Sequence, residues 1–144
     1  MTLASILKTK GHDVTTVRAT HTIAEVANRL AERRIGAVVV EDAAGQVLGV
    51  VSERDIVQGL ATHGAAALHM TAGQMMTTQI VTASPSTTVS EAMHLMTNGR
   101  FRHLPILEAG RLVGIASIGD IVKARLMQQE YEVDSLKAYV AGGV

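Results

Sequence analysis

Two serine–aspartate pairs of identical spacing are the residues best suited to bind a small molecule. Ser52 and Asp55 are separated by two residues, and so are Ser117 and Asp120. A carboxylate accepts hydrogen bonds from both hydroxyls of a ribose, and the free N–H groups at a helix start favour a phosphate. The same residue types are also typical of a capped helix start. One pair alone is better explained by capping, so the choice depends on the surrounding sequence.

Both pairs lie inside a longer internal repeat. The segment 22–25 (Thr-Ile-Ala-Glu) returns at 88–91 (Thr-Val-Ser-Glu), 66 positions later. The segment 49–57 returns at 114–122 with its aspartate shifted by 65 positions, so the second copy has lost one residue in its turn. A repeat of this kind is a structural unit. Because the polar residues recur at matching places, we predict two related copies of one site rather than one catalytic centre.

The composition limits the fold and its partners. A chain of 144 residues has the size of one ordinary domain and buries roughly two thirds of its unfolded surface. Aromatic residues make up only 2%, which disfavours base stacking, and the net charge is zero, with no basic run to attract nucleic acid or an anionic membrane. We therefore expect neither nucleic acid nor a membrane as a partner.

Metal and catalytic chemistry have little support in the sequence. There is no cysteine, and the six histidines form no His-Glu-x-x-His helix or tight cluster. No nucleophile with an adjacent base and no glycine-rich phosphate loop is visible. The first seven residues follow no basic segment and are too short for a signal-peptide core. We expect a cytoplasmic protein that is not an enzyme and holds no metal.

Each unit is expected to fold in the order β-α-β-β-α, which gives an α+β protein. In the first unit, residues 13–17 form a strand and a capping box of Thr22 and Glu25 starts a helix. Two β-branched runs then flank a turn as a hairpin, and a helix follows Ser52. The second unit repeats the order with a strand at 80–83, a helix at 89–97, a hairpin of 104–107 with 112–116, and a helix from Ile118.

The last helix is longer than its counterpart in the first unit. Charged residues cover most of it, but one stripe is apolar and consists of Val122, Leu126, Val133, Leu136 and Val140. A protein partner or a second copy of the chain could cover that stripe. Between the units, residues 63–73 are rich in alanine, glycine and threonine and predict a crossover loop with a short helical piece. Neither half is expected to be stable alone.

Three linked motifs resemble the CBS domain: 49–55 (Gly-Val-Val-Ser-Glu-Arg-Asp), 114–120 (Gly-Ile-Ala-Ser-Ile-Gly-Asp) and 101–106 (Phe-Arg-His-Leu-Pro-Ile). Over residues 8–130 the chain is similar to a stand-alone pair of such domains, also called a Bateman module. The resemblance implies tandem repeats at 8–65 and 74–130, related by a pseudo-twofold axis, with 131–144 as a C-terminal helix extension. It also implies two clefts, each able to take an adenosine-containing ligand such as AMP, ATP, NAD(H) or S-adenosylmethionine.

In this family a cleft joins the Ser-x-x-Asp segment of one repeat to the first strand of the other. Within that pattern we interpret both aspartates as ribose ligands. Arg54 is the expected phosphate ligand of the first cleft, because its fork of donors suits phosphate oxygens. The first cleft would therefore contain Ser52, Arg54, Asp55, Thr77, Ile80, Val81 and Thr82.

The second cleft is expected to bind phosphate differently, because Gly119 replaces the arginine. Anion recognition there must come from Arg102, His103 or Lys10. His103 is either a phosphate ligand whose charge varies near neutral pH or a polar residue packed under the strand. Arg33, Arg34 and Arg100 are interpreted as solvated helix-end charges, although they are expected near the clefts and could reach a longer phosphate chain. The second cleft would contain Val14, Thr15, Thr16, Arg102, His103, Ile115, Ser117 and Asp120, and Pro105 is a further expected ligand-binding residue.

Three functions remain open at this point. The first is a regulatory module that senses an adenine nucleotide and signals through its shape or assembly to a separate effector protein. The second is a structural module whose Ser-x-x-Asp segments only cap helices. The third is a small enzyme with Asp55 or Asp120 as a general base, which would need a raised pKa at positions where the anion is favoured. We favour the first. Members of the family commonly form dimers of such modules, and together with the apolar stripe this predicts a homodimer.

Overall fold

The computed structural model describes residues 1–142, and its helices begin where the sequence places capping residues. The hydroxyls of Thr22 and Thr88 accept backbone N–H groups at the starts of α2 (Ile23–Arg33) and α5 (Val89–Gly99). Ser52 does the same for α3 (Glu53–His63), and Ser117 precedes α6 (Ile118–Gly142). Two residues of the expected 131–144 extension, at 143 and 144, lie outside the described part.

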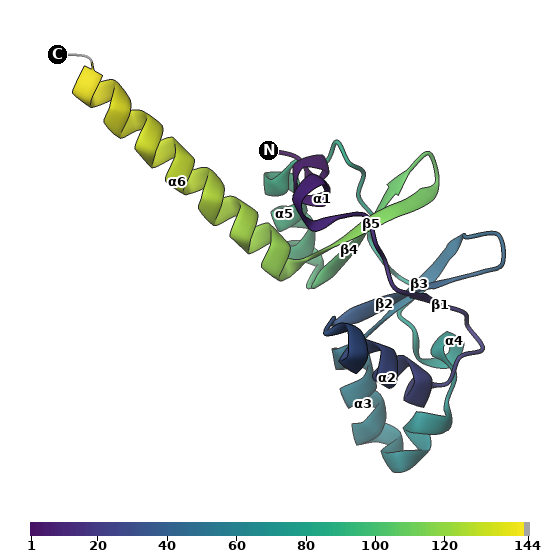
Figure 1. Cartoon of the computed structure of the whole chain (residues 1–144). Helices are drawn as coiled ribbons and strands as arrows, with labels where there is room; N and C mark the ends of the chain where they lie inside the picture. Colours follow the sequence, from purple (N-terminus) through teal and green to yellow (C-terminus); the bar gives the residue numbers. More distant parts are fainter. Residues whose placement is uncertain (143–144) are drawn as a thin grey trace.

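The strands form two small sheets, one in each unit (Figure 1). In the first, β1 (Thr16–Val17) runs parallel to β2 (Ala37–Glu41), which pairs antiparallel with β3 (Val47–Ser52). In the second, β4 (His103–Glu108) pairs antiparallel with β5 (Arg111–Ser117). Both predicted hairpins and the mixed α+β architecture are confirmed.

The first strand of each unit is shorter than predicted. Residues 13–17 yield only the two residues of β1, and the strand expected at 80–83 is reduced to a single bridge between Ala83 and Ile106. Ala83 donates to Pro105 O and accepts from the N–H of Leu107. The next bonds of a parallel ladder would need N–H groups from Pro105 and Pro85, which proline lacks. The two prolines of the chain therefore limit this pairing to one residue.

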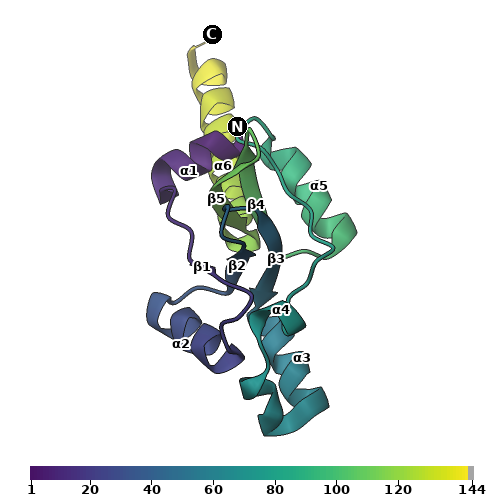
Figure 2. The same cartoon turned by 90° about the vertical axis from the view of Figure 1, so that its right-hand side faces the viewer.

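Each unit packs against a helix that precedes the other unit in the sequence. Helix α1 (Leu3–Lys10) comes before the first unit but packs into the hydrophobic cluster of the second, through Leu3 and Leu7. The 3-10 helix η1 (Gly64–His69) and helix α4 (Ala72–Met75) follow the first unit and pack against it. Figure 2 shows α1 beside β5 and α6, and α4 beside α3. This exchange ties the two units into one body.

Helix α6 leaves the body after its first turns. Ile121 and Ala124 are its two buried residues, and every residue from 129 to 142 is exposed. The helix therefore projects from the second unit as a free rod (Figure 1). Within residues 1–142, no helix combines the length and the hydropathy that crossing a membrane requires.

Candidate functional site

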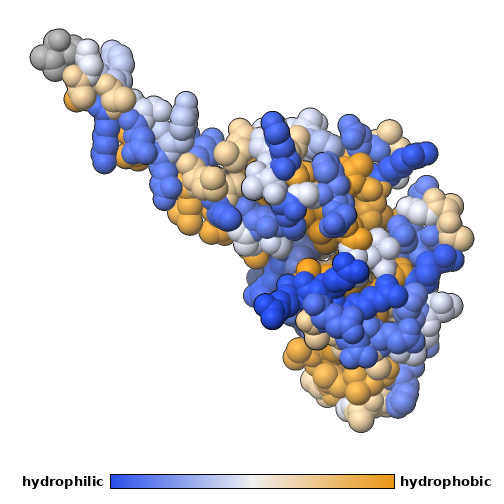
Figure 3. Space-filling view, in the orientation of Figure 1, coloured by the Kyte–Doolittle hydropathy of each residue, from blue (hydrophilic) through white to orange (hydrophobic). Residues whose placement is uncertain are grey.

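A cavity of about 260 Å³ lies between the two units, at the starts of α3 and β4. In the space-filling view, strongly hydrophilic side chains gather between the two halves (Figure 3). We call this cavity the first cleft. Its walls are formed by Gly36, Val50, Ser52, Glu53, Arg54, Asp55, Thr77, Ile80, Gly99, Arg100, Phe101, Arg102 and His103.

Asp55 is fixed in the first cleft by both units. Its Oδ2 accepts the N–H of Ser52 at 2.8 Å and the hydroxyl of Ser52 at 2.9 Å, which completes a capping box. Its Oδ1 accepts the hydroxyl of Thr77 at 3.1 Å. The segment that carries Thr77 is itself paired with Val50 of β3 by two backbone hydrogen bonds of 2.9 and 3.0 Å. Because a carboxylate oxygen accepts two bonds, Oδ1 retains capacity for a ligand hydroxyl.

Three arginines surround the first cleft. Arg54 lies in the first turn of α3, Arg100 is the left-handed residue that ends α5, and Arg102 directly precedes β4. All three are exposed, and none forms an ion pair with another described residue. The cleft therefore combines a carboxylate that can accept hydroxyls with three guanidinium groups that can bind an anion.

Arg102 and His103 line the first cleft, although the sequence pattern assigned them to the second. Gly36 lies in the same cleft wall. A Cβ atom at Gly36 would lie 3.2 Å from Nε2 of His103, so the absent side chain leaves room for the imidazole. Burial lowers the pKa of His103, and the nearby Lys10 lowers it further, against the opposing effect of Glu53. His103 is therefore mostly neutral at neutral pH.

The second Ser-x-x-Asp segment has a different environment. Oδ2 of Asp120 accepts the N–H of Ser117 at 2.8 Å and forms an ion pair with Nζ of Lys10 at 2.5 Å. Lys10 also donates to the carbonyl of Ile115 at 2.8 Å. Partial burial raises the pKa of Asp120, but the hydrogen bonds from Lys10 and Ser117 outweigh it, so the pKa is lowered. A lysine of the chain therefore holds the carboxylate that was expected to bind a second ribose.

The sequence matches the CBS domain family model twice, over residues 6–62 and 72–127. The chain belongs to the CBS domain family. The mitochondrial CBS domain-containing protein CBSX3 of Arabidopsis thaliana is 31% identical over 99% of this chain and 73% of its own length. The resemblance stated from the sequence motifs is thereby confirmed.

Solved structures agree with this assignment. A CBS-domain containing protein of Agrobacterium tumefaciens has a TM-score of 0.84 and 47% identity, with 87% of this chain and 99% of that chain covered. A CBS domain pair solved in complex with 5′-methylthioadenosine and S-adenosyl-L-methionine has a TM-score of 0.78 and 24% identity, with 90% and 98% covered. Tandem CBS repeats with a long C-terminal helix are therefore the fold of this chain.

The remaining predicted residues of the CBS pair lie outside the first cleft. Val81 packs against the hydrophobic cluster of the second repeat, and Thr82 is exposed. Pro105 is buried in β4. Val14, Thr15 and Thr16 do not line either described cavity.

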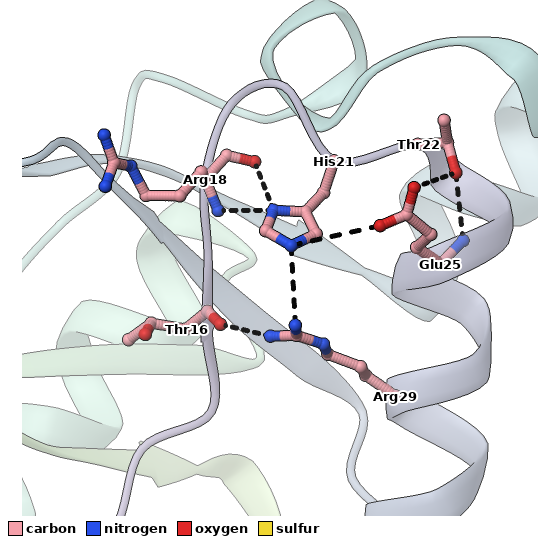
Figure 4. Close-up of polar contacts among 6 residues, drawn as sticks. All are labelled: Thr16, Arg18, His21, Thr22, Glu25 and Arg29. Atoms are coloured by element: carbon pink, nitrogen blue, oxygen red, sulfur yellow. Dashed lines mark hydrogen bonds and ion pairs between the residues drawn. The ribbon is translucent and has the colours of Figure 1, made fainter.

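Polar contacts fix the position of β1 in the first CBS repeat (Figure 4). Arg29 of α2 donates to the carbonyl of Thr16 at 2.9 Å, and His21 accepts the N–H of Arg18 at 3.0 Å. The carbonyl of Thr15 accepts the N–H of Val39 at 3.2 Å. These bonds hold Thr15 and Thr16 to β2 and α2, which gives them a structural role.

Sequence reasoning missed several residues of the first cleft. Phe101, the single phenylalanine of the CBS pair, stood inside a quoted motif but was not assigned to the site. Its half-buried ring lies against Gly99, where a Cβ atom would overlap it. Arg100 was interpreted as a solvated charge, and it is both exposed and part of the cleft wall. The sequence Arg100-Phe101-Arg102, an aromatic residue between two arginines, could have indicated that all three belong to the site.

Proposed function

We propose that this chain is a regulatory module that binds an adenosine-containing ligand in its first cleft. The observation that carries the proposal is the presence of Asp55 and three arginines in the wall of one cavity. The carboxylate would accept ribose hydroxyls, and the guanidinium groups would bind the phosphates. Phe101 adds an aromatic face in the same wall.

The comparisons support adenosine as the common part of the ligand. The CBS pair solved with 5′-methylthioadenosine and S-adenosyl-L-methionine shares the fold of this chain, although its identity of 24% gives no residue-level argument. Between the candidate ligands, three arginines favour those with phosphates, namely AMP, ATP or NAD(H), over S-adenosylmethionine, whose sulfonium is cationic. In this proposal the ligand is sensed rather than converted.

A structural module without a ligand is the second candidate function. The capping box of Ser52 and Asp55 favours it, since both residues already have a structural role. The two candidates differ in one measurable property, the stabilisation of the native state by nucleotide. A ligand in hundredfold excess over its Kd adds about 2.7 kcal/mol to the stability.

Thermal unfolding with AMP, ATP, NADH and S-adenosylmethionine tests this proposal. We expect at least one phosphate-bearing ligand to raise the melting temperature of the wild-type protein. Asp55→Asn should remove most of that shift, whereas Asp120→Asn, the matching cap position of the second repeat, should retain it. Unchanged melting curves with all four ligands would leave the structural module as the function.

The proposal also includes the route by which the module signals. A change of conformation in the CBS pair would be passed on through a contact with another protein. We include a homodimer and a separate effector in the proposal. The exposed apolar residues of α6 support a protein contact there.

A further inference from the structure

The second half of α6 has no packing partner among residues 1–142. From residue 129 to 142 all side chains are exposed, and they include Val133, Leu136 and Val140 with exposed fractions of 50%, 63% and 62%. A single helix of this length is only marginally stable in water without tertiary contacts. A partner that covers the apolar side would stabilise it. Figure 3 shows hydrophobic surface next to hydrophilic side chains along the projecting rod.

The apolar residues of α6 follow a heptad. Alternating steps of four and three residues connect Val122, Leu126, Gln129, Val133, Leu136 and Val140. These are the a and d positions of a coiled coil, with valine or leucine at five of the six. The sixth is Gln129, and one polar residue in such a seam typically fixes the register of the two strands.

The charges beside this seam determine which arrangement is favourable. Arg125 and Glu132 occupy g positions, and Glu130 and Lys137 occupy e positions. In a parallel dimer in register, a g residue faces the e residue five positions later in the other helix. Arg125 then faces Glu130 of the second copy, and Glu132 faces Lys137. All of these contacts are attractive, and none of the four residues forms an ion pair within residues 1–142.

Other occupants of the seam fit less well. An antiparallel pairing with all six layers would place Glu130 opposite Glu130 of the second copy and Lys123 opposite Lys137, which is repulsive. A lipid surface would need a helix rich in lysine and arginine on its polar side. The projecting part, residues 129–142, instead has one lysine, Lys137, and three acidic residues, Glu130, Glu132 and Asp134, so it is net negative.

We propose that two copies of this chain associate through α6 as a parallel coiled coil in register, with the seam running from Val122 to Val140. The contact is independent of the nucleotide proposal, because it uses no residue of the first cleft. It would place the last helices of two CBS pairs side by side and join the pairs at their second repeats. The occupant of the apolar stripe is thus a second copy of this chain.

Disulfide cross-linking tests the orientation, and the chain has no cysteine to interfere. Leu136→Cys places two thiols at the same level of a parallel seam, so oxidation should convert most of the full-length protein into a covalent dimer. Tyr131→Cys is the control, because it lies on the opposite side of the heptad. Equal cross-linking of both variants, or none for Leu136→Cys, would overturn the proposal.

Charge exchange tests the pairing by light scattering. Variant one carries Arg125→Glu and Lys137→Glu, and variant two carries Glu130→Lys and Glu132→Lys, so each repels itself in the parallel register. We expect the wild type at twice the 15.2 kDa chain mass, each variant near one chain mass, and the mixture again near twice that mass. A monomeric wild type, or variants that stay dimeric on their own, would contradict the proposal. Circular dichroism of each variant verifies that the repeats remain folded.

Discussion

Nζ of Lys10 lies 2.5 Å from Oδ2 of Asp120, although the two residues are 110 positions apart. In the first cleft the corresponding aspartate, Asp55, meets only the neutral hydroxyl of Thr77 from the other repeat. The two Ser-x-x-Asp segments therefore make the same backbone contact, but a positive charge neutralises Asp120 and a neutral hydroxyl contacts Asp55. The pseudo-twofold symmetry of the CBS pair holds for the fold and is broken at its two carboxylates.

This difference predicts one adenosine per chain. Replacement of the lysine by Lys10→Met should free Asp120 and allow a second adenosine to bind, because a hydrogen bond to a charged group contributes about 1.5–3 kcal/mol, or about 10–100-fold in affinity. Isothermal titration with adenosine, which lacks a phosphate, measures the stoichiometry. Lys8→Met, on the same helix and outside the ion pair, is the control. Two equal sites in the wild type would contradict the prediction.

Arg54 should act on phosphate alone. We expect Arg54→Ala to weaken AMP binding by about 10-fold or more, since a charge-assisted bond is lost, and to leave adenosine binding unchanged. Arg111→Ala, an exposed arginine at the start of β5 outside the cleft wall, should affect neither ligand. Titrations of both ligands into both variants provide the measurement. A matching loss of adenosine affinity would show that Arg54 supports the cleft rather than the phosphate.

Gly49 should tolerate no side chain. A Cβ atom there would lie 2.6 Å from the carbonyl oxygen of Thr77, a backbone atom held by hydrogen bonds to β3. We expect Gly49→Ala to lower the free energy of unfolding by about 1–3 kcal/mol. Gly119→Ala is the matched control, because its Cβ meets only Ser117 Oγ at 3.6 Å and alanine favours a helix by about 1 kcal/mol. Urea denaturation of both variants gives the comparison.

His103 should make stability depend on pH. Its pKa in the folded protein is lowered, mainly by burial and then by Lys10, so the unfolded chain binds more protons around pH 6. Stability then rises as pH increases from the folded pKa toward the unfolded value of about 6.5, and the full penalty is present below that window. Urea unfolding at pH 5.0 and 7.5 should show a larger difference for the wild type than for His103→Gln. Equal differences would remove His103 as the cause.

Asp120 also makes the stability of the protein increase with pH, but at a lower pH than His103 does. Its folded pKa is also lowered, so its contribution is present above the unfolded value and is lost as pH falls through the folded one. The measurements at pH 5.0 and 7.5 lie above that window. The two effects are therefore separable by choice of pH.

Local patterns explain which elements could be predicted from the sequence. Capping residues at Thr22, Ser52 and Thr88 act on neighbours three positions away, so the helix starts follow directly from them. The hairpins follow from β-branched runs around a turn. The strand at 80–83 could not be predicted in the same way, because its length depends on a missing N–H at Pro105, in a partner segment more than twenty residues later.

The site was predictable only where its contacts are local or shared by the family. The pairing of Asp55 with the segment around Thr77 follows the family pattern, and the structure contains that contact. The place of His103 depends on the absence of a side chain at Gly36, across the boundary of the repeats. The ion pair of Lys10 depends on α1, a helix that lies outside the repeated pattern. Contacts of this kind can be predicted only from the three-dimensional structure.

The exchange of α1 between the repeats has a consequence during synthesis. Leu3 and Leu7 are synthesised before the residues that bury them, because their cluster includes Leu104 and Ala116, which are made more than ninety residues later. Helix α1 therefore stays uncovered until β4 and β5 have been synthesised. During that interval α1 is a natural binding segment for chaperones, and its docking is expected to be among the last steps of folding.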